Sequence, residues 1–343
     1  MQRAILFGLG KDFRENLEYI KKHYYIIAYS DNKTIPLNCK EKYIVPYEIP
    51  KIQFDVLIIC TNFYFFDIKK QLIKIDKDLE NKIISLQQIY EGKLKKCECC
   101  ENEVRYLPLP DMYNTMQHKY GYKSGIGEFL NYEEYYCPLC QITDRGRLIV
   151  ALLRKYHLQN KEERVLQIAP EKVIGTWIKE NCPQCGYETT DLNMPDVTFN
   201  CDIQKMNMIS DNYYDLIICS HVFEHVKNDL CAMKELNRIL KKDGFGIFLV
   251  PIDMDLQQID EEWGLTEEEN WKRFGQGDHC RKYNRIGFIE RLKKSGFIVH
   301  CLGIEYFGKE IFDRNGITDT ACLYIVTKQE DTFEEKLLCC ERK

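Results

Sequence analysis

The segment from Tyr214 to Val226, YDLIICSHVFEHV, is the most informative stretch of the chain for chemistry. Its apolar run, Leu216 to Cys219, predicts a buried strand, and the polar residues that follow mark where this strand ends. In open α/β sheets, ligands bind in the crevice outside the carboxyl ends of the strands. We therefore expect this crevice to be lined by Ser220, His221, Glu224 and His225.

A second group of polar residues lies in the segment Phe274 to Tyr283, FGQGDHCRKY. It follows a long irregular stretch, and long loops in compact domains are usually functional or disordered. Its glycines and polar side chains are typical of a lid over a substrate. His279 is our first candidate for a general base, because histidine accepts protons near neutral pH. The alternative is that His279 pairs with Asp278 and anchors the loop.

Three arginines and a tyrosine complete the predicted substrate-binding set. Arg281 is the first candidate, with Arg145 and Arg147 as more distant ones, and Tyr283 lies beside Arg281 in the sequence. A guanidinium can bind a phosphate or carboxylate through two parallel hydrogen bonds. A surface salt bridge is the alternative interpretation for each arginine.

The elements that must position these residues follow the order of a doubly wound sheet. Strands that alternate with helices indicate a parallel sheet. Helices are predicted at 147–157, 171–180, 228–241 and 284–295. Strands are predicted at 164–168, 187–190, 198–201, 215–219, 245–250, 297–304 and 321–327, with an antiparallel hairpin at the end.

Three aspartates stand at the ends or starts of successive predicted strands. Asp191 ends the second strand, Asp202 follows the third, and Asp215 opens the fourth. A carboxylate at the end of the second strand can bind ribose hydroxyls, as in dinucleotide-binding folds. The first turn, by contrast, has no glycine before Gly175, and its Glu171 would repel a carboxylate on a bound ligand.

In order and spacing, these aspartates and the segment 214–226 resemble class I S-adenosylmethionine-dependent methyltransferases. The Ala-Pro-Glu first turn is similar to that of a bacterial subset that carries a zinc ribbon ending in Cys-Pro-x-Cys. Members of that subset also have an Asp-Arg-x-Arg-Leu stretch and a Phe-Gly-Gln…Asp-His-x-Arg-x-Tyr run. The matching segments here are 137–140, 144–148 and 274–283.

The resemblance covers about residues 97–328 and implies which residues bind S-adenosylmethionine. They are Gln167, Ala169, Pro170, Glu171, Asp191, Leu192, Asp202, Ile203, Ser220 and His221. In relatives the position of His221 often supports the sulfonium pocket. His221 therefore joins His279 and Asp278 as a catalytic candidate, while His225 has packing or capping as its alternative role.

Two close cysteine pairs, Cys97-x-x-Cys100 and Cys137-x-x-Cys140, lie in turn-like polar sequence. Two such pairs can supply four thiolates to a tetrahedral zinc ion, and a site closed by four cysteines is structural. The interval between them, 101–136, exceeds the usual spacing of about 15–20 residues, so a loop must be accommodated. The alternative is paired buried thiols. Cys182 and Cys185 form a weaker candidate pair, and Cys99, Cys339 and Cys340 have no assigned role.

Residues 1–92 also alternate strands and helices, with strands expected near 4–8, 25–29, 55–60 and 82–86. The Gly8-Leu9-Gly10 turn and Asp31, about 20 residues further on, suggest a nucleotide site. The glycine fingerprint is incomplete, because Phe13 stands where a third glycine would fall. This part resembles the small Rossmann-like N-terminal domains of enzymes in bacterial surface-sugar assembly. A scaffold or interaction module is the alternative to nucleotide binding.

The whole chain is therefore predicted to be an α/β protein with two Rossmann-like doubly wound domains joined by a small zinc-ribbon module. The expected boundaries are 1–92, 93–147 and 148–330, with a tail at 331–343. The net charge of -5 argues against a nucleic-acid partner, which would need clustered Lys and Arg. No apolar run approaches the roughly 20 residues of a membrane span, and the N-terminus opens into a strand, so we expect a cytoplasmic protein.

The expected activity is O-methylation of a small anionic or sugar-derived acceptor. The N-terminal resemblance connects it with bacterial surface-polysaccharide biosynthesis, that of capsule or lipopolysaccharide. Two alternatives stay open. One is RNA methylation, because some RNA methyltransferases carry zinc ribbons, and the other is a non-catalytic, zinc-stabilised scaffold.

Overall fold

The computed structural model describes residues 1–33, 42–90 and 94–333, and the chain divides into two compact units. Unit 1 comprises residues 1–107 and 137–141, and unit 2 comprises residues 108–136 and 142–343. The segment expected to form one zinc-ribbon module contributes to both units, because its cysteine pairs belong to unit 1 and residues 108–136 between them to unit 2. Most of the predicted tail, with Cys339 and Cys340, lies outside the described residues.

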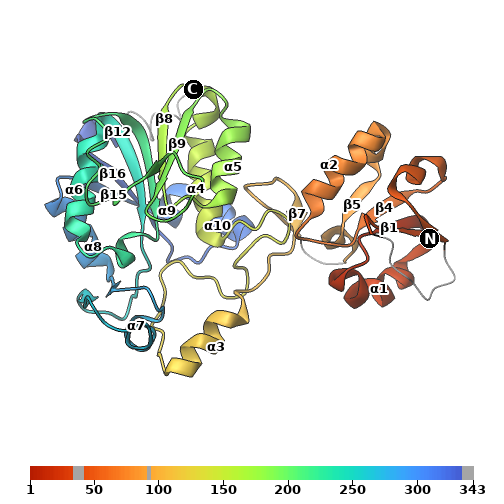
Figure 1. Cartoon of the computed structure of the whole chain (residues 1–343), viewed down its shortest axis with the longest axis horizontal. Coiled ribbons are helices and arrows are strands. Elements are labelled where there is room, and N and C mark those ends of the chain that lie inside the picture. The colour runs from red at the N-terminus through yellow and green to blue at the C-terminus, as the bar shows by residue number, and fades with distance from the viewer. Residues whose placement is uncertain (34–41, 91–93, 334–343) are drawn as a thin grey trace. The chain divides into compact units, whose positions relative to one another are not determined.

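Unit 1 is built on a five-stranded parallel sheet with the strand order β3-β2-β1-β4-β5 (Figure 1). Its central strands are short apolar runs that are buried on both faces, as parallel sheets require. The elements are β1 (Gln2–Phe7), α1 (Lys11–His23), β2 (Tyr24–Ser30), β3 (Lys42–Ile44), β4 (Val56–Ile59), α2 (Phe65–Ile75), β5 (Ile83–Ser85) and a small antiparallel pair, β6 (Lys95–Lys96) with β7 (Glu103–Val104).

Unit 2 contains a seven-stranded sheet with the order β10-β9-β8-β11-β12-β16-β15. The first five strands in this order are parallel, and β16 is antiparallel to both of its neighbours. The strands are β8 (Arg164–Ile168), β9 (Gly186–Asp191), β10 (Phe199–Asn200), β11 (Tyr214–Ser220), β12 (Leu240–Leu249), β15 (Ile298–Leu302) and β16 (Leu323–Thr327). A separate antiparallel pair is formed by β13 (Asp260–Glu261) and β14 (Arg281–Lys282).

The helices of unit 2 connect these strands and extend beyond them. They are α3 (Asp111–Tyr120), α4 (Asp144–Lys155), α5 (Lys172–Asn181), α6 (Asp229–Ile239), α7 (Glu267–Phe274), α8 (Arg285–Lys294), α9 (Ile304–Phe307), α10 (Lys309–Asn315) and α11 (Glu330–Phe333). Among the helices of the described residues, none is long and apolar enough to cross a membrane.

The predicted elements of unit 2 are present, with shifts of a few residues at their ends. The strand at 164–168 has the predicted bounds, and the antiparallel arrangement of the last strands is confirmed. The largest difference is β12, which begins at Leu240 directly after α6, whereas the sequence predicts a strand from Phe245. Helix α4 begins three residues early because the Thr143 side chain accepts a hydrogen bond from the Gly146 backbone N–H, 3.3 Å.

Parallel register brings the ends of three strands of unit 2 to one edge of the sheet. Ile168 at the end of β8 pairs with Thr190 of β9 on one side and with Cys219 of β11 on the other. The residues next in sequence to these paired residues, Ala169, Asp191 and Ser220, therefore lie along the same edge. Ligands of doubly wound sheets bind there.

The segment between the cysteine pairs lies along this sheet and adds to unit 2. Backbone hydrogen bonds tie it to the residues after β12, from Glu128 N to Ile252 O (3.1 Å) and from Met254 N to Ile126 O (2.8 Å). The buried carboxylate of Glu128 accepts a hydrogen bond from the Tyr324 hydroxyl, 2.7 Å, and forms an ion pair with Arg285. The sequence indicates only that a long loop separates the two cysteine pairs. In the structure, residues 108–136 of this loop are part of the fold of unit 2.

Arg147 has a structural role in place of the predicted substrate binding. Its side chain is 0% exposed, and its guanidinium donates hydrogen bonds to four backbone carbonyls, those of Glu134, Tyr135, Ile142 and Asn315. These carbonyls belong to residues 108–136, which we call the inserted segment, to the turn before α4 and to the end of α10. Four of the five N–H groups of this guanidinium are therefore used within the protein.

Arg147→Ala should therefore destabilise the protein strongly, because four carbonyls would lose a buried charged donor. We expect the free energy of unfolding to fall by more than about 3 kcal/mol, measured by urea denaturation. The exposed Lys234→Ala on α6 is the control, with an expected change within about 0.5 kcal/mol. Equal stabilities of the two variants would contradict the structural role of Arg147.

Candidate active site

A cavity of about 360 Å³ opens in unit 2 beside the carboxyl ends of β11 and β12. Its walls come from three parts of the chain that are distant in the sequence. The segment 108–136 supplies five aromatic residues among others, the end of β11 supplies histidines and a glutamate, and the loop around α7 closes the third side. The lining includes Tyr113, Tyr122, Phe129, Tyr132, Tyr135, Arg145, His221, Glu224, His225, Phe274, His279, Arg281 and Lys282.

Glu224 lies at the centre of a group of histidines in this cavity. It is 1% exposed, in a single helical turn that spans Phe223–His225. Its Oε1 lies 3.6 Å from His221 Nδ1 and 4.0 Å from His225 Nε2, and neither carboxylate oxygen has a hydrogen-bond partner among the described residues. The His225 and His279 rings contact edge to face, with centroids 4.7 Å apart. Glu224 therefore belongs to the site although its burial makes a charge there costly.

The loop around β14 completes the group through Asp278 and His279. Asp278 accepts from His225 through its carboxylate, 3.3 Å from Nδ1, and through its backbone carbonyl, 3.2 Å from the same atom. The predicted partner of Asp278 was His279, so the pairing is with a different histidine. His279 is 5% exposed, and its ring lines the cavity beside the ring of His225.

Burial sets the protonation of these groups in opposite directions. It raises the pKa of Glu224 to about 7 and lowers the pKa of His279 to about 3, and it also lowers the pKa of His221, together with the positive charge of Arg145. Burial opposes charge on His225 too, but its hydrogen bond to Asp278 and the nearby Glu224 carboxylate outweigh this and raise its pKa. The same hydrogen bond lowers the pKa of Asp278.

The turn after β8, the first turn of unit 2, has an unusual backbone conformation and a carboxylate that is paired with an arginine. Ala169 has φ of +45°, the left-handed region that most side chains avoid, and His221 after β11 has φ of +57°. Glu171 Oε2 lies 3.4 Å from a guanidinium nitrogen of Arg145, so the carboxylate that would repel an anionic ligand has a positive partner. Gln167 is buried and accepts a hydrogen bond from the Tyr187 hydroxyl, 2.6 Å, while Pro170 precedes the helix α5.

Asp191 and Asp202 stand where the sequence predicts them, at the ends of β9 and after β10. Asp191 Oδ1 accepts hydrogen bonds from the backbone N–H groups of Asn193 (2.7 Å) and Met194 (2.8 Å), which holds the carboxylate at the end of its strand. Asp202 accepts from the Gln204 side chain and backbone. Leu192 is exposed and Ile203 is buried beside these acids.

Ser220 ends β11, and its buried hydroxyl has no hydrogen-bond partner among the described residues. The backbone of His221, the next residue, donates to Leu249 O, 2.9 Å, and so aligns the turn with the end of β12. Ser220 and His221 thus lie at the same sheet edge as Ala169 and Asp191. The predicted set of cofactor-binding positions is brought together at this edge.

The side chains of Arg281 and Tyr283, both predicted to bind substrate, form buried hydrogen bonds within unit 2, and Arg281 also lines the cavity. Arg281 is 4% exposed, and its guanidinium contacts the Glu261 carboxylate and the carbonyls of Phe223, Val226 and Lys227. The hydroxyl of the fully buried Tyr283 donates to Asp229, 2.5 Å. Arg145, which also lines the cavity, differs from both, because its Nε is buried without a hydrogen-bond partner among the described residues.

Unit 1 contains a second cluster, formed by the thiols of Cys97, Cys100, Cys137 and Cys140. All four sulfur atoms lie within 4.8 Å of one another, with Sγ–Sγ distances of 3.8 Å for Cys97–Cys140 and 3.9 Å for Cys100–Cys137. A disulfide would need about 2.05 Å, whereas sulfurs about 2.3 Å from a tetrahedral zinc ion lie about 3.8 Å apart. The thiols therefore fit zinc.

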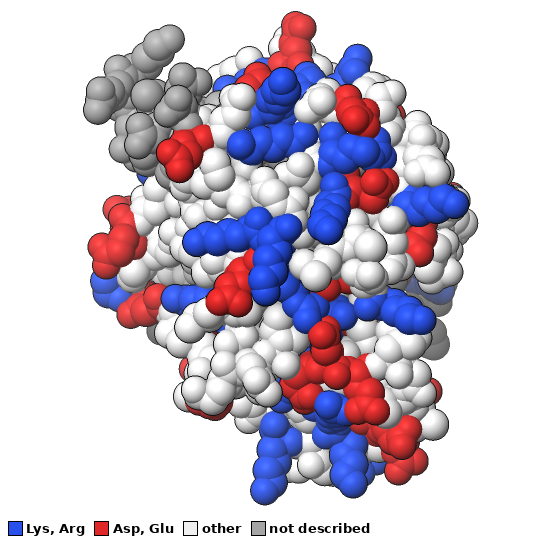
Figure 2. All heavy atoms as spheres, turned by 90° about the vertical axis from the view of Figure 1, so that its left-hand side faces the viewer, with Lys and Arg blue, Asp and Glu red and all other residues white. Residues whose placement is uncertain are grey.

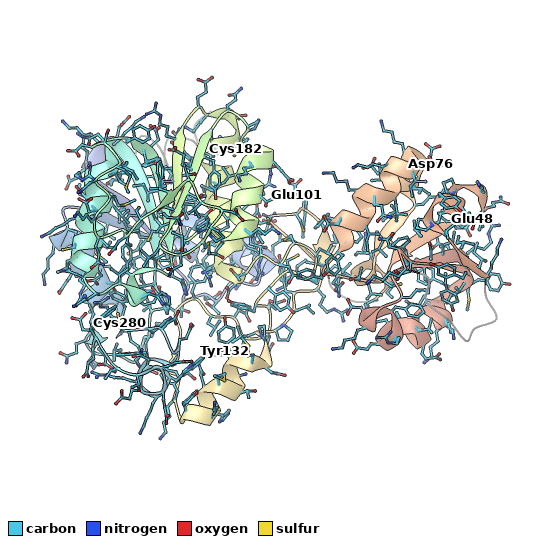
Figure 3. The ribbon with its side chains drawn as sticks, in the orientation of Figure 1. Glu48, Asp76, Glu101, Tyr132, Cys182 and Cys280 are labelled. Atoms are coloured by element: carbon cyan, nitrogen blue, oxygen red, sulfur yellow. The ribbon has the colours of Figure 1, made fainter. Side chains whose placement is uncertain are left out.

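The backbone of the two cysteine pairs repeats the same turn. Glu101 and Gln141, the residues after each pair, have φ of 58° and 65°. Each donates its backbone N–H to the backbone carbonyl oxygen of the first cysteine of its pair, at 2.9 Å. The remaining candidate pair differs. Cys182 (Figure 3) follows α5, and the Cys185 thiol donates to the Lys161 carbonyl, 3.4 Å, in no cluster of three or more ligands among the described residues.

The carboxylate of Asp31 forms hydrogen bonds within the glycine turn of unit 1. Asp31 at the end of β2 accepts hydrogen bonds from the backbone N–H groups of Leu9 (2.7 Å) and Lys33 (3.0 Å). Gly8 has φ of +87°, which the turn requires. The carboxylate that the sequence offers to a nucleotide ribose thus has a structural function in the turn.

Comparison with known families agrees with the topology of unit 2. Residues 144–302 match the family model described as a methyltransferase domain, and residues 1–84 match the model described as C2185-like, N-terminal. No curated protein matches the chain. Unit 2 therefore contains a methyltransferase domain, whose match covers residues 144–302 of the 343, and S-adenosylmethionine is the methyl donor of this class of domain.

Solved structures of methyltransferases resemble the same part of the chain. An S-adenosylmethionine-dependent methyltransferase from Archaeoglobus fulgidus has 16% identity over 52% of this chain and 91% of its own, with a TM-score of 0.33. One from Aquifex aeolicus has 14% identity over 51% and 85%, with a TM-score of 0.32. The YcgJ protein from Bacillus subtilis has 14% identity over 51% and 95%, with a TM-score of 0.32. At these values the likenesses carry no argument about function.

Sequence reasoning missed the aromatic wall of the cavity and the central position of Glu224. Tyr113, Tyr122 and Tyr135 reach the site from the inserted segment, whose excess length and tyrosine content were the only signals. Contact with α7 helps to position them. Gly275 has φ of +81°, and a Cβ there would come within 2.6 Å of the Tyr122 ring.

We expect Asp191→Asn to weaken S-adenosylmethionine binding about 10- to 100-fold, because a charged acceptor for two ribose hydroxyls would become neutral. Isothermal titration calorimetry measures the affinity. The exposed Asp196→Asn in the same loop is the matched control and should bind as the unmodified protein does. Equal affinities of the two variants would remove Asp191 from the cofactor site.

Proposed function

We propose that unit 2 transfers a methyl group from S-adenosylmethionine to a hydroxyl group of a small anionic or sugar-derived acceptor bound in the cavity. The observation that carries this proposal is the cavity itself, where histidines and an arginine with a free Nε meet an aromatic wall beside the predicted cofactor edge. When bound, the cofactor supplies an electrophilic methyl group: the acceptor oxygen bonds to it, the carbon–sulfur bond breaks with its electron pair kept by sulfur, and the hydroxyl proton is lost.

The residues of the sheet edge would bind and orient the donor. Asp191 is assigned to the ribose, and Asp202 with Ile203 to the adenine. The turn from Gln167 to Glu171 would approach the methionine part closely, because the left-handed Ala169 places backbone there in place of side chain. Leu192, Ser220 and His221 complete the proposed set.

The cavity side would bind the acceptor and assist the loss of its proton. His279, our first candidate for the base, lines the cavity together with His221 and His225, and Asp278 acts through its hydrogen bond to His225. Arg145 Nε is available to an anionic group of the acceptor. Exclusion of water and correct alignment account for most of the rate of an in-line methyl transfer.

A sugar-derived acceptor is supported by the tyrosine-lined wall, which offers apolar ring faces together with hydroxyl groups. Its place in surface-polysaccharide biosynthesis rests on the resemblance of residues 1–92 alone. RNA methylation has less support. On the face of unit 2 drawn in Figure 2, basic and acidic side chains are intermixed, without the continuous basic stripe that is typical of nucleic-acid binding.

The four thiols of unit 1 are proposed to hold a structural zinc ion, because their spacing fits tetrahedral coordination and no position is left open. Cys97→Ser should lower the zinc content from about one ion per chain to near zero, and should lower the melting temperature of the protein. Cys99→Ser, which changes the cysteine beside the cluster, is the matched control. Elemental analysis that finds zinc retained in Cys97→Ser would contradict this assignment.

The methyl-transfer proposal is tested with labelled S-adenosylmethionine and a panel of acceptors, which includes sugar phosphates, nucleotide sugars, uronic acids and transcribed transfer RNA. We expect label to enter a hydroxyl group of an anionic sugar. Label in RNA only would replace the proposed substrate class. A protein that gives no heat on titration with S-adenosylmethionine, is not thermally stabilised by it and labels no acceptor would leave the non-catalytic scaffold as the function.

A further inference from the structure

We propose that Glu224, His225 and His279 bind a divalent transition-metal cation in the acceptor cavity. This site is separate from the four-thiol cluster of unit 1 and consists of nitrogen and oxygen donors only. One carboxylate oxygen and one ring nitrogen from each histidine lie within 4.8 Å of one another. All three residues line the same cavity.

The distances within the group are too long for hydrogen bonds and suitable for a shared ion. Glu224 Oε1 and His225 Nε2 are 4.0 Å apart, beyond the range of a hydrogen bond. Two ligand atoms that each lie about 2.1 Å from one cation are separated by about 3–4 Å. A shift of less than about 1 Å at the widest pair would bring all three donors into that range.

The carboxylate of Glu224 is the observation that calls for a cation. It is 1% exposed, and both of its oxygens lack a hydrogen-bond partner among the described residues. Burying a carboxylate without a partner is costly, and such groups in proteins are usually paired or coordinate a metal. His221 Nδ1, 3.6 Å from Oε1, is also outside hydrogen-bonding distance.

His225 is already oriented as a metal ligand. Its Nδ1 is the atom that contacts Asp278, both at the carboxylate and at the backbone carbonyl. A proton held on Nδ1 by these acceptors leaves the lone pair on Nε2, which faces Glu224. Metal-binding histidines typically donate their second N–H to a carboxylate or carbonyl in this way, which fixes the tautomer and ring orientation.

The donor set defines the kind of cation and leaves room for a substrate. Two histidines and one carboxylate suit zinc, iron(II), manganese or cobalt, and such sites keep open positions for water or substrate. Here the open positions would face the cavity. The catalytic consequence rests on the proposed function. With the cation bound, the ring nitrogen of His279 would be a ligand and would no longer act as the base. An acceptor hydroxyl bound to the cation would lose its proton to solvent more readily, and its oxygen would then attack the methyl carbon.

The test is a titration with Mn²⁺ of full-length protein that carries one zinc ion per chain, at the thiols, followed by electron paramagnetic resonance and calorimetry. Mn²⁺ prefers oxygen and nitrogen ligands, so it should leave the thiol cluster occupied by zinc. We expect one Mn²⁺ ion per chain. Glu224→Gln and His279→Ala should weaken binding at least 10-fold, and Asp278→Asn about 10-fold through the orientation of His225. The exposed His118→Ala is the control and should bind Mn²⁺ unchanged.

Two further readouts separate the possible failures. Melting temperature and S-adenosylmethionine affinity establish that each variant is folded, and in the unmodified protein Co²⁺ should show no thiolate charge-transfer absorption if it binds nitrogen and oxygen. Absence of Mn²⁺ and Co²⁺ binding, or equal binding by Glu224→Gln and His279→Ala, would overturn the metal site while leaving methyl transfer intact. Metal binding without any binding of S-adenosylmethionine would instead overturn the proposed function and leave the site.

Discussion

The parallel pairing of β8 with β9 and β11 is the constraint on which the site depends. Strands that run in one direction in register must end at one edge, so residues distant in the sequence, such as Ala169, Asp191 and Ser220, are neighbours there. The edge also brings two left-handed residues, Ala169 and His221, to adjacent turns. Both turns present backbone groups to the space where a ligand binds, which is how a first turn without glycine can still serve a methyltransferase domain.

Buried charges attach the acceptor side to this sheet. Arg147 joins the inserted segment to α4 and α10 through carbonyls, and Glu128 joins it to β16 and α8 through Tyr324 and Arg285. Each of these charges is satisfied by several partners, which is the condition under which burial of a charge is tolerated. Glu224 is different, since it is as deeply buried but lacks such partners. Glu128 and Glu224 are thus buried carboxylates of two kinds, the first with partners in the framework of unit 2 and the second, at the cavity, without hydrogen-bond partners among the described residues.

The sequence predicted well whatever depends on local pattern. Apolar runs located the strands, and the aspartates after them stand where they were expected, because strand ends and turns are determined by neighbouring residues. The buried hydrogen bonds of Arg147, Arg281 and Tyr283 were not predicted, since charge and residue type do not reveal which partners a side chain meets in the fold. The pairing of Asp278 with His225 and the aromatic wall also depend on contacts between distant segments. The spacing of the cysteine pairs anticipated their clustering, but not that residues 108–136 between them belong to another unit.

The position of the wall in the sequence has a consequence for how such an enzyme can change. Residues 108–136 shape the acceptor side, whereas the residues assigned to the donor lie between 167 and 221. Most of the aromatic residues of the cavity wall therefore come from one continuous segment, with a cysteine pair before it and another after it, and the two pairs meet at one cluster. Insertion, deletion or exchange within that segment alters what the cavity admits without rewriting the donor residues. Mutations in the part of the gene that encodes residues 108–136 would therefore change the acceptor side of the cavity and leave the residues assigned to the methyl donor unchanged.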